Sequence, residues 1–292
     1  MSTPRFLNLP PGVTPTRLET PQGAFAALEA LPVSGVVERW PAILVPGLTG
    51  SKEDFIAVLQ TLAQSGRRVL AIDLRGQYET PGPDDPAAYT CAALGADIDA
   101  LAQLVGGGEA VHLVGHSFGG LVSREAVIDG RTKFASFTLM SSGPAGLPGK
   151  RAKILRETPE QGLEQLWHAR FEPEALAQGV PDEIVAFLRK RLLANSPTGL
   201  AAMSEAVLGA VDRTDELRQI EVPTLVIFGE HDDGWPPETQ AEMARRLGAE
   251  FMVVPGAVHS PAVEAPETTA QALVRFWNAA EKHSLDIRPN SV

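Results

Sequence analysis

The feature that most constrains this chain is a short apolar run that ends in Gly-x-Ser-x-Gly and leads directly into a helical pattern. Residues 111–120 read Val-His-Leu-Val-Gly-His-Ser-Phe-Gly-Gly, and the following residues continue at helical spacing. A strand that turns sharply into a helix needs glycine on both sides of the turn, because strand and helix nearly touch there. Ser117 stands at the apex, where the positive end of the helix dipole faces charge that forms at the hydroxyl. The pattern predicts an activated serine; a structural serine in an ordinary turn is the alternative.

Length and composition bound the class of protein. The chain has 292 residues, of which 44% are apolar and 21% charged, so it can bury a large core as one large α/β domain or two small ones. The net charge is −11, and no block of lysine and arginine interrupts the sequence. This acidic balance argues against nucleic acid or an anionic membrane surface as a partner.

Cysteine usage and the N-terminal residues indicate the compartment. The single cysteine, Cys91, cannot form an intramolecular disulfide, and its helical context predicts a packing residue. The N-terminal stretch lacks the apolar run of about 7–15 residues that a signal peptide carries. No run approaches the roughly 18 apolar residues of a membrane span. We therefore expect a cytoplasmic protein, with export by a route that the sequence does not reveal as the open alternative.

Short apolar runs alternate with longer segments of helical period along most of the chain. Strands are predicted at residues 42–45, 68–72, 110–114, 134–140, 224–228 and 251–254, with helices at 52–64, 87–105, 118–129, 237–247 and 266–280. Continuously apolar strands that alternate with helices predict a parallel sheet covered on both faces. Residues 15–30 resemble an antiparallel hairpin at the sheet edge, and residues 283–292 a loose tail.

One segment breaks this alternation. Between Gly143 and Ile220 the pattern is helical only, interrupted by proline and glycine, with helices predicted at 149–157, 159–170, 173–178, 181–193 and 198–212. We expect a core of residues 1–143 and 213–282 with a helical insertion at residues 144–212. The apolar residues of the insertion either form its own core or face an apolar substrate cavity, and the sequence leaves both open.

A serine hydroxyl is a weak nucleophile, so it needs a base, and the base needs an acid that orients it. His259 is the best candidate base, because it follows the predicted strand 251–254 at the edge of the sheet where open α/β sheets hold their active sites. His112 lies on the strand before the serine and is predicted to be a core residue, and His116, next to Ser117, is predicted to pack nearby. The remaining histidines lie in the insertion, next to acidic residues and in the tail: His168, His231 and His283.

Candidates for the acid follow the predicted strand 224–228. Asp232 or Asp233 could reach His259 from this loop, and Glu230 is less suitable. At least two of these three carboxylates would then merely solvate a polar loop.

Together these motifs resemble the α/β-hydrolase family over about residues 20–282. The order Ser117, Asp232, His259 is the family's order of nucleophile, acid and histidine. In the family the acid typically lies three residues after the glycine that closes the seventh strand, which favours Asp232 over Asp233. The resemblance implies an α/β-hydrolase fold: a mostly parallel eight-stranded sheet, helices on both faces and a helical cap inserted after strand six.

The resemblance also implies an oxyanion hole made of two backbone N–H groups. Phe118 follows the serine, and Leu48 lies in the loop after strand 42–45; their N–H groups occupy the family's positions. Two departures stand out. Relatives usually have histidine where this chain has Pro46, and the segment 73–80 differs from the usual Asp-x-Arg-Gly-x-Gly-x-Ser at Tyr78 and Thr80. Because of the second departure, we do not assign the substrate of the commonest relatives to this chain.

These features lead us to expect a serine hydrolase that cleaves a carboxylic ester or related acyl substrate through an acyl-enzyme intermediate. Ser117 attacks the carbonyl, His259 takes its proton and Asp232 orients the histidine. Neither a metal nor an organic cofactor is required, and the expected partner is a small acyl or ester substrate. Alternatives within the fold are carbon–carbon bond hydrolysis, perhydrolysis and acyl transfer. A ligand-binding protein with little turnover is the alternative of a different class.

Overall fold

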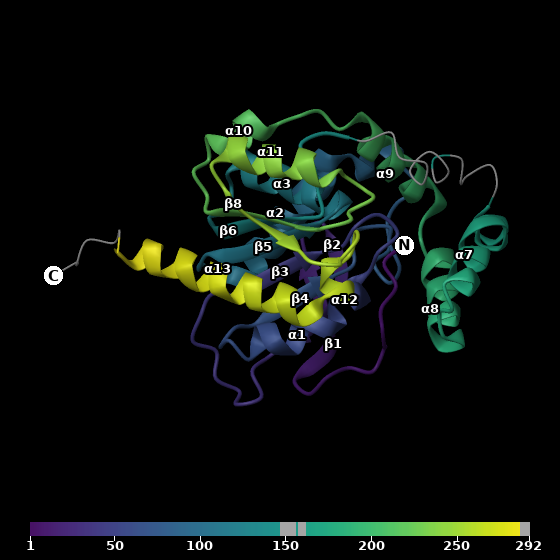
Figure 1. Ribbon diagram of the computed structural model, residues 1–292, viewed down its shortest axis with the longest axis horizontal. Helices are drawn as coiled ribbons and strands as arrows, with labels where there is room; N and C mark the ends of the chain where they lie inside the picture. The colour runs from purple at the N-terminus through teal and green to yellow at the C-terminus, as the bar shows by residue number, and fades with distance from the viewer. Residues whose placement is uncertain (147–155, 157–161, 287–292) are drawn as a thin grey trace.

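The computed structural model describes residues 1–146, 156 and 162–286, and within these residues one eight-stranded sheet forms the centre of the molecule (Figure 1). The strand order is β1-β2-β4-β3-β5-β6-β7-β8. β2 pairs antiparallel with β1 and β4, and all other neighbours are parallel. The strands are β1 (Val13–Thr20), β2 (Gly23–Ala30), β3 (Ala42–Val45), β4 (Val69–Ile72), β5 (Val111–His116), β6 (Phe134–Met140), β7 (Thr224–Gly229) and β8 (Glu250–Val254). The predicted sheet and its edge hairpin are thereby confirmed.

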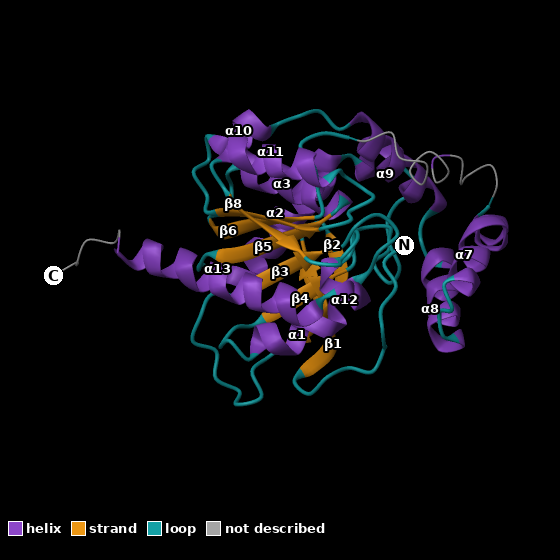
Figure 2. Cartoon of the chain, in the orientation of Figure 1, coloured by secondary structure: helices purple, strands orange, loops and turns teal. Residues whose placement is uncertain are grey.

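Helices cover both faces of the sheet (Figure 2). Side chains alternate along a strand, so Ile43 and Val45 of β3 pack into one core and Ala42 and Leu44 into the other. The first core includes residues of α2, α3 and α11, and the second those of α1 and α13. The helices around the sheet are η1 (Lys52–Phe55), α1 (Ile56–Ala63), η2 (Pro86–Tyr89), α2 (Cys91–Gly106), α3 (Phe118–Asp129), α11 (Pro237–Leu247), α12 (Pro261–Glu264) and α13 (Pro266–Asp286).

Between β6 and β7 the described residues contain helices and no strand. These are α6 (Leu163–Leu166), the π-helical turn η3 (Trp167–Phe171), α7 (Glu172–Ala177), α8 (Asp182–Leu193), α9 (Pro197–Gly209) and α10 (Thr214–Arg218). In Figure 1, α7 and α8 lie at the right of the view, with loops between them and the sheet, whereas α10 lies next to α3 and α11 of the core. The helix predicted at 149–157 lies outside the described residues except for Arg156. The limits of the insertion, 144–212, stay a prediction.

A buried ion pair joins the helical insertion to the core. Arg191 of α8 is fully buried, and its Nη1 donates to Asp54 Oδ1 of η1 at 2.7 Å. Its Nη2 donates to the carbonyl of Ser2 at 2.6 Å. Because a charge buried without its partner is very costly, these contacts fix where α8 docks on the core.

The C-terminal helix is longer than the sequence predicts. α13 continues through Asp286, so the predicted end at residue 280 was wrong, and residues 287–292 lie outside the described part. The loose tail at residues 283–292 stays a prediction. No glycine or proline ends the helix after Ala280, and Glu281 ties this end to the core. Its carboxylate accepts from Arg67 at 2.8 Å and Arg39 at 2.8 Å. Among the described residues, no helix combines the length and apolar character needed to cross a membrane.

Candidate active site

Ser117 forms the sharp turn that the sequence predicts between β5 and α3. Its backbone has φ 54° and ψ −120°, a strained conformation that clusters at functional sites. A Cβ atom on Gly115 would lie 2.5 Å from the carbonyl oxygen of Gly119, so only glycine permits this approach of strand and helix. Within residues 111–120 Ser117 alone is not buried. The turn therefore presents the hydroxyl at the surface of the core.

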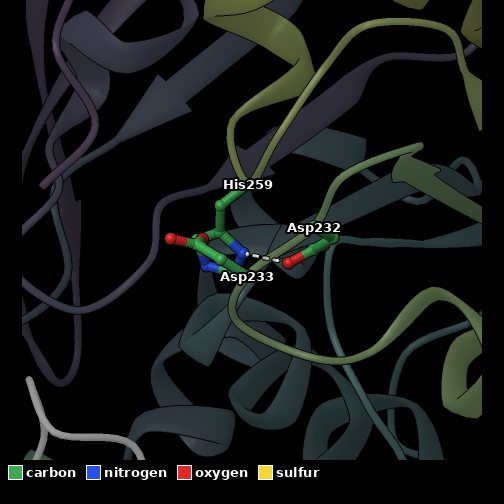
Figure 3. Close-up of side chains that lie close together, drawn as sticks. All are labelled: Asp232, Asp233 and His259. Carbon is green, nitrogen blue, oxygen red and sulfur yellow. Dashed lines mark hydrogen bonds and ion pairs between the residues drawn. The ribbon is translucent and has the colours of Figure 1, made fainter.

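His259 links Ser117 to Asp232 by two hydrogen bonds. His259 Nε2 lies 3.0 Å from Ser117 Oγ. On the other side of the ring, His259 Nδ1 lies 2.8 Å from Asp232 Oδ1, the contact dashed in Figure 3. The loops after β7 and β8 carry the acid and the histidine, and these neighbouring parallel strands end at the same edge of the sheet. Because a carboxylate only accepts, Nδ1 carries the proton and Nε2 offers its lone pair to the serine.

Asp232 is held as a carboxylate by the groups around it. Its side chain is fully buried, and it accepts from the N–H of Gly234 at 2.8 Å and from Gln240 Nε2 at 2.9 Å. Burial raises the pKa of Asp232, but the hydrogen bonds from His259 and Gln240 outweigh it and hold the pKa below its ordinary value. The carboxylate is therefore ionised at neutral pH and can stabilise a protonated histidine.

Asp233 and Glu230, the other acidic candidates, are exposed. Glu230 accepts from the N–H of Gly256 at 2.9 Å, which is a contact within the loops. Potential ligand atoms of Asp232, Asp233 and His259 lie within 4.8 Å of one another (Figure 3). Since Asp232 and His259 already bond to each other, the geometry fits an acid–base pair better than a metal site.

The loop after β3 lies directly against the serine turn. A Cβ atom on Gly47 would lie 3.0 Å from Ser117 Cβ, and one on Gly119 would lie 2.4 Å from the carbonyl oxygen of Pro46. Proline at position 46 thus leaves the loop in contact with the turn. Leu48 is the one residue of 46–51 that is not buried. Phe118 begins α3, so its N–H has no partner within that helix. Both predicted oxyanion donors are therefore brought to the neighbourhood of Ser117.

Two further side chains lie next to His259, and one of them bonds to its backbone. His116 is buried, and its Nε2 donates to the backbone carbonyl of His259 at 2.7 Å. Burial, together with the nearby His259, lowers the pKa of His116 to about 4, so it is neutral at pH 7. The indole of Trp235 lies nearly parallel to the His259 ring at 6.3 Å between centroids, and its N–H donates to the carbonyl of Ala145 at 2.8 Å. The sequence predicts for His116 only packing near the serine, and its adjacency to Ser117 is the sole signal.

The other described histidines lie away from this chain of hydrogen bonds. His112 is buried in the core, where it bonds to Ser136 at 2.8 Å and Glu281 at 3.1 Å, which confirms the prediction of a core residue. His168 and His231 are exposed. The side chain of His283 lies outside the described part.

Known proteins resemble this chain over most of its length. A model described as the alpha/beta hydrolase family matches residues 42–272. Proline iminopeptidase from Lactobacillus delbrueckii subsp. lactis is 25% identical over 272 residues, which cover 84% of this chain and 92% of that protein. Non-heme haloperoxidase from Rhodococcus erythropolis is 29% identical over 260 residues, covering 81% and 91%. Among solved structures, a thermophilic esterase from Thermogutta terrifontis aligns with a TM-score of 0.73 at 25% identity, covering 91% of this chain and 99% of that one. The match of the family model over most of the sequence shows that this chain belongs to the alpha/beta hydrolase family.

Proposed function

We propose that this protein is a serine hydrolase that cleaves a carboxylic ester or a related acyl substrate through an acyl-enzyme intermediate. The observation that carries the proposal is the hydrogen-bonded series Asp232–His259–Ser117, with contacts of 2.8 and 3.0 Å. A nucleophile, a base within hydrogen-bond reach and an acid that orients the base are the parts that acyl transfer by serine requires. The strained turn at Ser117 supports the same role.

In the proposed reaction Ser117 Oγ attacks the substrate carbonyl while its proton passes to His259 Nε2. Asp232 stabilises the imidazolium, and the N–H groups of Leu48 and Phe118 donate to the oxyanion. The alcohol leaves with the proton from His259, and the acyl group stays on Ser117. A water molecule then gives a proton to His259 and attacks the acyl carbonyl, which releases the acid and restores the serine.

The same residues serve several reactions, so they do not by themselves determine which bond is cleaved. The similarity to a thermophilic esterase, which covers 91% of this chain, favours an ester. A relative named as a proline iminopeptidase adds amide hydrolysis as an alternative. Perhydrolysis, carbon–carbon bond hydrolysis and acyl transfer stay the alternatives that the sequence leaves open. The aligned side chains of Ser117, His259 and Asp232 argue against a binding protein with little turnover. A cytoplasmic location stays a prediction of the sequence.

The test is a hydrolysis screen with the Ser117→Ala variant as the blank. Nitrophenyl esters and thioesters from acetyl to dodecanoyl form the main panel, with a proline arylamide and a peracid assay beside it. We expect turnover of at least one ester or thioester that is lost in Ser117→Ala. Turnover of the arylamide alone would replace the ester proposal by a peptidase. Equal rates in the variant and the wild type would refute a serine hydrolase.

A further inference from the structure

The segment 73–80, where the sequence departs from the family pattern, reaches the oxyanion loop through one buried side chain. Gln77 has no exposed surface. Its Oε1 accepts from the N–H of Thr49 at 2.6 Å, and its Nε2 donates to the carbonyl of Gly47 at 3.2 Å. These contacts involve the residues directly before and after Leu48. One side-chain carboxamide therefore holds the backbone on both sides of Leu48. Both contacts are buried, and loss of the first leaves the N–H of Thr49 without this acceptor. The Gly47 carbonyl also accepts from the N–H of Gly50 at 3.0 Å, so Gln77 and Gly50 hold it together.

The orientation of one peptide follows from the second contact. The carbonyl of Gly47 and the N–H of Leu48 belong to the same peptide, and the described part of the chain holds no cis peptide. In a trans peptide these two groups point in opposite directions. A hydrogen bond from Gln77 to the carbonyl therefore turns the Leu48 N–H away from Gln77. Gly47 itself lies against Ser117, since a Cβ atom on Gly47 would be 3.0 Å from Ser117 Cβ.

The first contact fixes a strained residue. Thr49 is buried and has φ 63°, a left-handed conformation that β-branched residues rarely adopt. Such a conformation persists only where surrounding contacts determine it, and the Gln77 bond to the Thr49 N–H is one of them. Gln77 is itself anchored, since its N–H donates to the carbonyl of Leu74 at 2.9 Å and its carbonyl accepts from the N–H of Thr80 at 3.1 Å.

We propose that Gln77 is a positioning residue that aims the Leu48 N–H at the oxyanion; this inference rests on the proposed function. The side chain of Pro46 offers the loop no hydrogen bond, and Gln77 supplies two. The contacts of Gln77 are with the loop and not with the reacting atoms. An oxyanion donor acts mainly in the transition state, so loss of its alignment lowers kcat and leaves KM nearly unchanged.

Gln77→Glu separates the two contacts. The introduced carboxylate still accepts from the Thr49 N–H, but it has no donor and faces the Gly47 carbonyl oxygen. With the best ester of the screen we expect kcat to fall about 100-fold, the effect of losing one oxyanion donor, and KM to change less than about twofold. Protonation of the introduced carboxylate at lower pH restores a donor. The ratio of the variant's kcat to that of the wild type should therefore rise as the pH falls.

Two variants accompany this measurement. Methionine has a similar volume and makes neither contact, so the kcat of Gln77→Met relative to that of the wild type should be low at every pH. Gln77→Met also takes the place of Gln77→Glu if that variant does not fold. Gln22→Glu adds the same charge in the exposed turn between β1 and β2 and should leave kcat unchanged. The inference is overturned if Gln77→Glu and Gln77→Met retain the kcat of the wild type, if KM rises as kcat falls, or if the ratio for Gln77→Glu is independent of pH. Each of these outcomes leaves the proposed function intact, because the wild type still hydrolyses the ester. If the wild type and Ser117→Ala have equal rates, the proposed function fails, and the inference with it.

Discussion

Replacing Asp232 by asparagine keeps the size of the side chain but cannot satisfy the hydrogen bonds that converge on it. Oδ1 accepts from His259 Nδ1 and from the Gly234 N–H, each at 2.8 Å, and Oδ2 accepts from Gln240 Nε2 at 2.9 Å. If the amide oxygen of asparagine takes the Oδ1 position, its NH2 group faces the donor of Gln240. If the amide turns round, its NH2 group faces His259 Nδ1, and the imidazole must carry its proton on Nε2, toward Ser117.

Both arrangements impair the base. In the first, the imidazolium that forms during attack loses its counter-charge; in the second, Nε2 cannot accept the serine proton. An Asp→Asn change in a Ser–His–Asp triad lowers kcat about 10⁴-fold with the geometry intact, which corresponds to about 5.4 kcal/mol at about 1.36 kcal/mol per factor of ten. For Asp232→Asn we expect a loss of about 10³–10⁴ in kcat, with KM within a few-fold of the wild type.

Asp233→Asn is the matched control. It removes the same charge one residue away, from an exposed side chain close to His259. Steady-state hydrolysis of the best ester gives kcat and KM for both variants, and thermal unfolding checks that both are folded. We expect Asp233→Asn to stay within about threefold of the wild type, since a single exposed charge is screened by solvent. A large loss in Asp233→Asn with a small loss in Asp232→Asn would refute the assignment, and small losses in both would refute an orienting acid altogether.

Three stability measurements test the surroundings of the site. The pKa of His116 is about 4 in the folded protein, against 6.5 ordinarily. Between these pH values the unfolded chain binds a proton at this residue that the folded chain does not. The free energy of unfolding should therefore decrease as the pH is lowered through this window, by up to about 1.4 kcal/mol per pH unit. His116→Gln should reduce that slope in urea titrations, and equal slopes would contradict the burial argument. Arg191→Met leaves Asp54 buried and unpaired, so we expect a loss of about 3–5 kcal/mol in unfolding free energy; the double variant with Asp54→Leu should recover part of it, and no recovery would argue against the pair. Thr80 Oγ1 accepts from the Ala26 N–H at 2.9 Å, so Thr80→Val should cost about 1–3 kcal/mol and Thr80→Ser little. A small cost for Thr80→Val with a larger cost for Thr80→Ser would show that the methyl group matters instead.

The sequence predicts the parts of the site that local pattern or sheet topology determines. The turn at Ser117 follows from a strand, two glycines and a helix that are contiguous in the chain. His259 and Asp232 follow from the rule that the carboxyl ends of neighbouring parallel strands meet at one edge, and the structure brings both to Ser117.

The contacts that the sequence does not predict depend on the paths of loops. The His116 side chain meets the carbonyl of His259, and Gln77 meets Gly47 and Thr49, through side chains that carry no periodic pattern. The length of α13 was underestimated for a similar reason. Glu281 continues the helix because it bonds to Arg67, Arg39 and His112, partners that are far away in the sequence.

The central claim is that Ser117 is a nucleophile activated by His259, and covalent labelling with a fluorophosphonate tests it most directly. The wild type, Ser117→Ala and His259→Ala are treated with the reagent, and the modified peptide is identified by mass spectrometry. We predict one phosphonyl adduct on Ser117 in the wild type, none in Ser117→Ala and much slower labelling in His259→Ala. A wild type that stays unlabelled, or a Ser117→Ala variant that is labelled at the same rate, would contradict the account.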